Sequence, residues 1–271
     1  MAKALIMDVT LCNGCHNCQI ACKDEFVEND WPPYSAAQPD TGHFWMKTNE
    51  FVRGTVPKVK VAYVCTPCMQ CDTAPCMKAA TGGAIYKRDD GIVIIDPVKS
   101  KGQKQIVDAC PYGVIYWNET TGIPQKCTFC AHLLDRGWKE PRCVEACPVG
   151  ALTFGEYDDL KATIQQKGAL PLNPEFGTQP RVYYIGVPKK FIAGALVDSS
   201  TGECLNGADV TVKDTATGTT TAGKSDAFGD FWFDGLESNK TYEVTISATG
   251  KTSKTISVTL ATDTNLGDIQ L

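Results

Sequence analysis

The distribution of cysteine constrains this chain more than any other feature. Thirteen of its 14 cysteines lie between Cys12 and Cys147, and only Cys204 lies beyond them. Residues 11–22 read LCNGCHNCQIAC, which contains a Cys-x2-Cys-x2-Cys-x3-Cys run typical of proteins that bind [4Fe–4S] clusters. The first half of the chain is therefore expected to bind metal, and the second half is not.

The cysteines fall into four blocks, and their spacing predicts how they are shared. Three cysteines on one loop hold one cluster, and the fourth cysteine of the run ligates the other cluster of a pair. Applied to this chain, the rule predicts three sets of ligands. They are Cys12, Cys15, Cys18 and Cys147 (set 1), Cys22, Cys127, Cys130 and Cys143 (set 2), and Cys68, Cys71, Cys76 and Cys110 (set 3). Cys65 and Cys204 are expected not to be ligands.

A fourth set is missing as a whole. The spacing of the other blocks places its members at four positions without cysteine, which are Ala80, Ser100, Gln103 and Ile106. All four ligands are lost together, while the other three sets are complete. We therefore expect three [4Fe–4S] clusters, with the fourth site filled by protein.

An internal repeat accompanies the cysteines. CPYGVIYW from Cys110 and CPVGALTF from Cys147 share a ligand, a proline turn, a glycine and a short strand. ATGGAIYK from Ala80 is a damaged third copy that keeps the glycine and the strand. The repeat suggests duplicated ferredoxin-like units.

Two other metal chemistries were weighed against this interpretation. Structural zinc uses four ligands in two knuckles and does not explain the interlocked runs. The segment CNGCH fits the pattern for attachment of a c-type haem, but a haem leaves the other cysteines unexplained. His16 then reads as a surface or supporting residue, and His132 as a polar residue or a donor to a cluster sulfur or a partner group.

Composition limits the partners and the location of the chain. The net charge of -5 argues against a nucleic-acid partner, which favours a basic surface. No apolar run is long enough to span a membrane, and the first residues lack a signal-peptide pattern. So many cysteines in a reducing compartment are expected to be metal ligands, which favours the cytoplasm. Export together with a partner that carries the signal remains an alternative.

The domain organisation follows from the same change in composition. We expect an α+β protein: a three-cluster domain of duplicated bacterial-ferredoxin-like units over 1–155, with an insertion at 24–64. Residues 156–188 are expected to form a helix and an extended linker. Residues 189–271 alternate apolar and polar residues between Gly, Asn and Asp turns, which predicts an all-β sandwich. The insertion is aromatic and proline-rich, and it either packs over the clusters or faces a partner.

The predicted chemistry is electron transfer. A cluster held by four thiolates has no open position for substrate, and its reaction is a one-electron step. The sequence has no dinucleotide fingerprint, P-loop or recognisable catalytic arrangement. We therefore expect no catalytic residue in this chain and a partner subunit that performs the substrate chemistry.

The first 185 or so residues resemble the iron–sulfur (B) subunits of the dimethyl-sulfoxide-reductase molybdopterin family. The resemblance rests on segments such as CNGCHNCQIAC, TPCMQCDTAPC and PRCVEACPVGAL. The missing fourth set and the tail segments FGDFWFDGL and LGDIQL narrow it to the phenol-acting group. That group includes the small subunits of pyrogallol–phloroglucinol transhydroxylase and resorcinol hydroxylase, with a transthyretin-like C-terminal domain.

The resemblance implies a heterodimer with a large catalytic subunit. That subunit would bind molybdopterin guanine dinucleotide with Mo or W and act on phenols by hydroxyl transfer, hydroxylation or dehydroxylation. By analogy, set 1 would lie nearest to it. Two alternatives stay open: an iron–sulfur subunit of a respiratory oxyanion or sulfur-compound reductase, and a free polyferredoxin.

Overall fold

The computed structural model describes residues 2–271, which divide into two compact units. Unit 1 contains the residues up to Phe51 together with Ala62–Val187. Unit 2 contains Val52–Val61 together with Pro188–Leu271. The predicted change of architecture near residue 189 coincides with the beginning of the second segment of unit 2.

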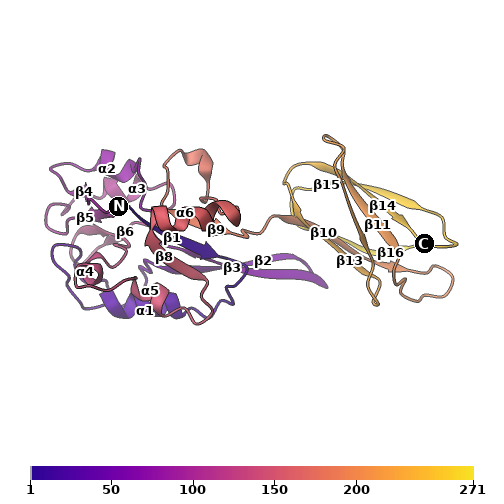
Figure 1. Cartoon of the computed structure of the whole chain (residues 1–271), viewed down its shortest axis with the longest axis horizontal. Coiled ribbons are helices and arrows are strands. Elements are labelled where there is room, and N and C mark those ends of the chain that lie inside the picture. The colour runs from indigo at the N-terminus through magenta and orange to yellow at the C-terminus, as the bar shows by residue number, and fades with distance from the viewer. Residues whose placement is uncertain (1) are drawn as a thin grey trace. The chain divides into compact units, whose positions relative to one another are not determined.

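The centre of unit 1 is a three-stranded sheet in the order β8-β1-β9 (Figure 1). Strand β1 (Lys3–Asp8) pairs antiparallel with β8 (Leu152–Glu156) and parallel with β9 (Val182–Ile185). The apolar sequence of β1 is explained by burial on both faces, since alternate residues of a strand point to opposite sides. Leu5 lies in the core that contains the cysteines.

Helix α6 (Tyr157–Gln166) covers the other face of this sheet. Leu160 and Ile164 of the helix pack with Ala4 and Ile6 of β1. Asp158 and Asp159 lie in its first turn, where carboxylates stabilise the positive end of the helix dipole. The helix predicted for this stretch is confirmed, although the residues that follow it are not simply extended: they include a short 3-10 helix (Pro174–Phe176) and β9.

Short helices carry or flank most of the cysteines of unit 1. They are α1 (Asn17–Phe26), α2 (Pro75–Ala79), α3 (Gln105–Asp108), α4 (Ala131–Leu134) and α5 (Arg142–Glu145). Helix α1 packs against α5, and α2 packs against α3. Residues that are far apart in the sequence, such as Cys22 and Cys143, are thereby brought into one core.

Three segments of unit 1 share one local geometry. Gly83, Gly113 and Gly150 each adopt a positive φ, at 68°, 62° and 64°. A short strand follows each glycine, namely β4 (Ile85–Lys87), β6 (Tyr116–Asn118) and β8. Strand β4 pairs with β5 (Val93–Ile95), and β6 pairs with β7 (Ile123–Gln125). The turn-and-strand unit recognised in the sequence is thus formed at all three positions, including the copy without cysteine.

The segment expected as an insertion contains a long hairpin. Its strands are β2 (Lys47–Thr55) and β3 (Lys58–Thr66), and its tip, Val52–Val61, belongs to unit 2. Within unit 2 the tip is held by ion pairs. Lys58 pairs with Asp230, Lys60 Nζ lies 2.5 Å from Asp234 Oδ2, and Arg53 Nη1 lies 3.2 Å from Asp263 Oδ1.

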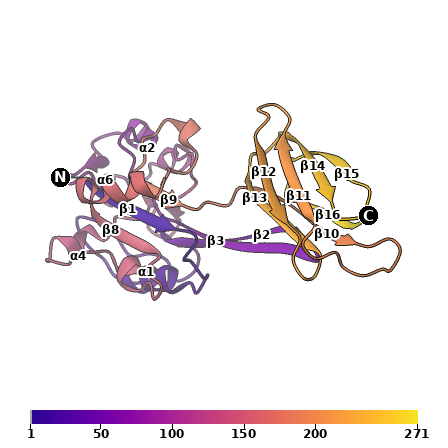
Figure 2. The ribbon, with the colours of Figure 1, turned by 45° about the vertical axis from the view of Figure 1, so that its right-hand side comes forward.

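Unit 2 is a β-sandwich of two sheets (Figure 2). One sheet has the order β13-β10-β16, and the other has the order β12-β11-β14-β15. The strands are β10 (Lys190–Val197), β11 (Asp209–Asp214), β12 (Thr220–Lys224), β13 (Asp230–Leu236), β14 (Thr241–Ser247), β15 (Lys254–Thr259) and β16 (Thr264–Gln270). Inward residues such as Leu196, Val210, Phe231 and Val244 form its core.

Six of these seven strands were predicted from the alternation of apolar and polar residues. The exception is β12, whose sequence TTAGK has no large apolar residue and lies exposed at the edge of its sheet. Its pairing with β11 is therefore a backbone interaction that hydrophobic periodicity does not reveal.

Candidate metal centres

The four thiols of set 1 line one cavity. Cys12, Cys15, Cys18 and Cys147 surround about 300 Å³ of space that protein atoms do not occupy. The first three come from the loop that leads into α1, and the fourth comes from the turn before β8. Cys15 is exposed at the surface, so this cavity lies at an edge of unit 1.

The four thiols of set 3 line a second cavity. Cys68, Cys71, Cys76 and Cys110 surround about 340 Å³ of unoccupied space. The remaining wall is mostly apolar and includes Met69, Val93, Val114 and Ile115. Such a wall excludes water and leaves the thiols as the principal polar groups of the cavity.

Set 2 is completely buried in the core. Burial raises the pKa of Cys22, and the charges of Cys127 and Cys130 raise it further. Burial also raises the pKa of Cys143, and Cys130, Cys22 and Cys127 add to that rise. These mutual effects require that the four thiols lie together. The structure therefore brings together the four members of each predicted set.

Local backbone geometry turns the cysteine loops inward. His16, Gln70, Phe129 and Cys130 all adopt positive φ angles, between 49° and 61°. Non-glycine residues are strained in this region, by about 1–3 kcal/mol each, and such strain concentrates at functional sites. Backbone amides also point at sulfur: Phe129 N–H donates to Cys127 Sγ over 3.4 Å. These features favour thiolates that converge on a bound group.

The chemistry of the donors fits [4Fe–4S] clusters. Burial raises the pKa of Cys71 to about 12 and that of Cys76 to about 11, with neighbouring cysteines adding to the shift of Cys71. Four crowded thiolates therefore need a positively charged group between them, and metal binding would release their protons. Soft thiolates in groups of four are the ligands that such clusters use.

The sets are arranged in the order 1-2-3. The charge of Cys18 in set 1 raises the pKa of Cys22 and Cys143 in set 2, after burial and the members of set 2 itself. Burial and then the charge of Cys68 in set 3 raise the pKa of Cys127 in set 2 to about 11. Set 2 thus has a neighbour on each side.

Cys65 occupies a place that sequence reasoning missed. It was expected to be a small buried residue, and it is buried, but it also lines the cavity of set 1. Its Sγ lies 3.6 Å from Cys18 Sγ and 3.4 Å from Thr48 Oγ1. The hydrogen bond with Cys65 lowers the pKa of Cys18 and raises that of Cys65, which assigns Cys65 as the donor. Cys204 is an exposed residue of unit 2.

The four positions of the missing set are filled by protein. Ser100 and Ile106 are completely buried. The Gln103 side chain accepts a hydrogen bond of 2.9 Å from Thr81 N–H and donates to the carbonyl of Lys99 over 2.9 Å. These groups are engaged with the protein itself.

His132 lies near set 2 but its ring is already oriented. Its Nε2 lies 2.9 Å from Glu25 Oε1, and the ring stacks on Trp31 at a centroid distance of 4.5 Å. Its buried Nδ1 has no hydrogen-bond partner. His16, by contrast, lines the cavity of set 1.

The described residues hold neither a mononuclear metal site nor a membrane-spanning helix. Over residues 2–271, no three His, Cys, Asp or Glu side chains converge tightly enough to hold a single metal ion. No helix within the same residues is both long and apolar enough to cross a membrane.

Comparisons with known proteins agree with this chemistry. Residues 59–157 match the family model of the 4Fe-4S dicluster domain, and residues 192–271 match that of the carboxypeptidase regulatory-like domain. The chain therefore combines a ferredoxin-like 4Fe–4S part with a transthyretin-like β domain, as predicted.

Three curated relatives are similar over different lengths. The pyrogallol hydroxytransferase small subunit of Pelobacter acidigallici is 42% identical and covers 98% of each chain. One subunit of the sulfite dehydrogenase of Allochromatium vinosum is 34% identical over 67% of this chain and 82% of its own. The iron–sulfur subunit of a Shewanella arsenate respiratory reductase is 31% identical over 68% of this chain and 96% of its own.

These relatives confirm the resemblance recognised in the sequence, and the first of them extends it through both units. The chain belongs to the family of iron–sulfur (B) subunits of the dimethyl-sulfoxide-reductase type of molybdenum oxidoreductase, in which it is a non-catalytic, electron-transferring subunit.

Proposed function

We propose that this chain holds three [4Fe–4S] clusters and transfers electrons for a molybdopterin catalytic subunit that acts on phenols. The observation that carries the proposal is the gathering of twelve cysteines into three sets in the order 1-2-3. The clusters would supply one-electron transfer, which needs no open coordination site.

The protein around the sets is suited to a relay. Set 2 is buried, so the protein excludes water from the middle of the path. At set 1, Cys15 reaches the surface, and Leu11, Ile20 and Val149 are exposed apolar residues of the same cysteine segments. Exposed apolar groups of this kind suit a partner subunit. We infer that the catalytic subunit docks beside set 1.

The filled fourth site supports a count of three. Buried Ser100 and Ile106 stand where two ligands would be needed, and neither side chain has the thiolate that iron requires. We infer that the path ends at set 3. The shared geometry at Gly83, Gly113 and Gly150 supports a duplicated origin for the cluster units.

The length of the similarity supports a phenol-acting complex. The pyrogallol hydroxytransferase small subunit matches 98% of this chain, whereas the two reductase and dehydrogenase subunits match 67–68%. We infer a heterodimer with a large subunit that binds molybdopterin guanine dinucleotide with Mo or W. Its reaction would be hydroxyl transfer, hydroxylation or dehydroxylation of an aromatic ring.

The state of the cysteines bears on the location. All fourteen are free thiols rather than disulfides, which favours a reducing compartment. We infer that the complex works in the cytoplasm.

Purification of the native complex tests the proposal. Iron and acid-labile sulfide should each be about twelve per chain, and the co-eluting subunit should contain molybdenum or tungsten. The complex should turn over pyrogallol or resorcinol, and not thiosulfate, arsenate or nitrate. About sixteen irons would refute the filled fourth site. Activity with an oxyanion or sulfur compound alone would favour the respiratory alternative, and absence of any partner would favour a free polyferredoxin.

A further inference from the structure

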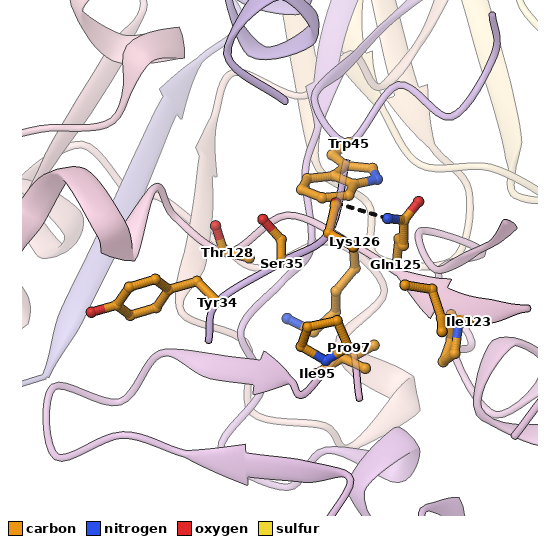
Figure 3. Close-up of a pocket in the computed structure, with 11 residues that line it drawn as sticks. Tyr34, Ser35, Trp45, Ile95, Pro97, Ile123, Gln125, Lys126 and Thr128 are labelled. Carbon is orange, nitrogen blue, oxygen red and sulfur yellow. Dashed lines mark hydrogen bonds between the residues drawn. The ribbon is translucent and has the colours of Figure 1, made fainter. Parts of the chain in front are cut away.

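Lys126 is a buried cation without an acidic partner. It is 2% exposed, and its Nζ donates hydrogen bonds to the carbonyls of Val93, over 2.5 Å, and Cys127, over 3.1 Å. Among residues 2–271, no carboxylate lies within ion-pair distance of it. It borders a cavity whose other lining residues, including Trp45, Gln125 and Pro97, include no acidic group (Figure 3).

A buried, unpaired ammonium is unfavourable. Removal of an ion from water costs several kcal/mol unless an opposite charge compensates for it. Elsewhere the chain follows this rule, since Lys58, at 5% exposed, forms an ion pair with Asp230. Two carbonyl groups satisfy the hydrogen bonds of Lys126 but do not neutralise its charge. A compensating anion is therefore expected close to Lys126.

The position of Lys126 indicates which groups supply the negative charge. Lys126 precedes Cys127 of set 2, and the other carbonyl that it contacts belongs to Val93, which lines the cavity of set 3. Burial raises the pKa of Cys76 in set 3, and the Lys126 ammonium opposes that rise. Burial likewise raises the pKa of Cys127, and Lys126 opposes it. The ammonium therefore acts on thiolates of both sets.

A second side chain fixes this arrangement. Gln70 Nε2 donates a hydrogen bond of 3.0 Å to the Cys127 carbonyl, and Gln70 Oε1 accepts one of 2.8 Å from Val93 N–H. Lys126 and Gln70 thus bind the same two peptide segments. The ammonium is held at one place between sets 2 and 3 by the backbone.

We propose that Lys126 is a fixed counter-charge shared by the clusters of sets 2 and 3, which raises the reduction potentials of both and leaves set 1 little affected. The inference rests on the proposed function, because it requires clusters at these sets. Four thiolates make each cluster anionic, and reduction adds a further negative charge. A nearby cation in a low-dielectric interior favours the reduced form. One residue would thus set two successive steps of the relay together.

Redox titration of the intact complex, monitored by electron paramagnetic resonance, tests this inference. Lys126→Met removes the charge and keeps most of the side-chain volume, whereas Lys126→Arg keeps the charge. In the Met variant, two of the three one-electron steps should move to lower potential. The reduced-to-oxidised ratio at a fixed potential should fall at least tenfold, which corresponds to about 59 mV for a one-electron couple. The Arg variant should stay close to wild type.

Lys87→Met is the matched control. Lys87 Nζ lies 3.4 Å from the carbonyl of Cys71 in set 3, but it is paired with Asp72 and its side chain is 27% exposed. The same substitution there should shift the potentials much less, because the ion pair and solvent already offset the charge. An equal shift in both Met variants, or no shift in Lys126→Met with all iron present, would overturn the inference.

Iron analysis separates this outcome from failure of the proposed function. Wild-type protein without iron–sulfur clusters would refute the proposed function itself. If Lys126→Met loses iron from two clusters while Lys126→Arg keeps it, the positive charge is needed to hold the anionic clusters, which supports the inference. If both variants lose the same iron, the amine has only a structural role and the inference is wrong.

Discussion

Gln70 Nε2 donates a hydrogen bond of 3.0 Å to the backbone carbonyl of Cys127. Gln70 lies between Cys68 and Cys71 of set 3, and Cys127 belongs to set 2, so one hydrogen bond joins the two cysteine loops. The Gln70 side chain is buried, and its oxygen accepts from Val93 N–H. Both ends of the amide are thus used, and neither can be replaced by water.

Replacement of Gln70 by leucine should therefore destabilise the region between sets 2 and 3. The change leaves a buried carbonyl of Cys127 and a buried N–H of Val93 without their partner. Each unsatisfied buried group costs about 1–3 kcal/mol. We expect the cluster absorbance of the complex to be lost at a lower temperature, with the iron of sets 2 and 3 released before that of set 1.

Gln105→Leu provides the control for this prediction. Gln105 is exposed, and its Nε2 makes a hydrogen bond of 3.4 Å to the carbonyl of Ala79. Water replaces that bond readily, so the temperature of cluster loss should be almost unchanged. Equal effects of the two substitutions would show that the Gln70 link does not hold the sets together.

A second prediction concerns the independence of set 3. Cys110 lines only the cavity of set 3, so Cys110→Ser should remove about four of about twelve irons per chain and leave the other clusters in place. Iron analysis together with electron paramagnetic resonance measures this. Cys204→Ser, at an exposed position of unit 2, should leave the iron content at the wild-type value. Loss of all iron in the Cys110 variant would contradict the separation of the sets.

Local patterns in the sequence were sufficient to predict much of this architecture. The cysteine spacing predicted which thiols lie together, because ligands on one short loop cannot separate by more than the loop allows. Helix α6 was predicted from its amphipathic pattern and the glycine that follows it, and six strands of unit 2 were predicted from alternation. Each of these signals is contained within a few residues of the element that it specifies.

The features that were missed depend on contacts between distant residues. Lys126 reads as an ordinary surface cation in the sequence, and only the packing of Val93 and Cys127 around it makes it buried. Cys65 stands three residues before a ligand of set 3, yet it contacts Cys18 of set 1, because β3 brings it there. The tip of the β2–β3 hairpin was likewise missed as a part of unit 2, since its ion-pair partners come much later in the chain; from Lys60 to Asp234 the separation is 174.

The place of Cys65 leads to a third prediction. Its thiol lies 3.6 Å from Cys18 Sγ, and donation of a hydrogen bond to a ligand sulfur stabilises the reduced form of a cluster. Cys65→Ala should therefore keep about twelve irons per chain and lower the potential of a single one-electron step, that of set 1. Cys65→Ser should restore part of the shift, because a hydroxyl can donate in place of the thiol. Release of about four irons from the alanine variant would instead identify Cys65 as a ligand.

The last prediction concerns Gly54, at the tip of the hairpin. Gly54 has a φ of 86°, and a Cβ there would lie 2.3 Å from the Lys58 carbonyl oxygen and 2.6 Å from Phe191 Cζ. Gly54→Ala therefore combines backbone strain with a clash against the backbone of unit 2, at a cost of about 1–3 kcal/mol or more. Hydrogen exchange of the amides of residues 52–61 should become faster, while the iron content stays unchanged, because every ligand set lies in unit 1. Gly218→Ala is the matched control, since its φ is 75° but no atom lies within 4 Å of the added Cβ. It should show only the strain of about 1–2 kcal/mol. If the two variants show the same increase in exchange, the close approach of Phe191 to the hairpin tip does not contribute to the stability of unit 2.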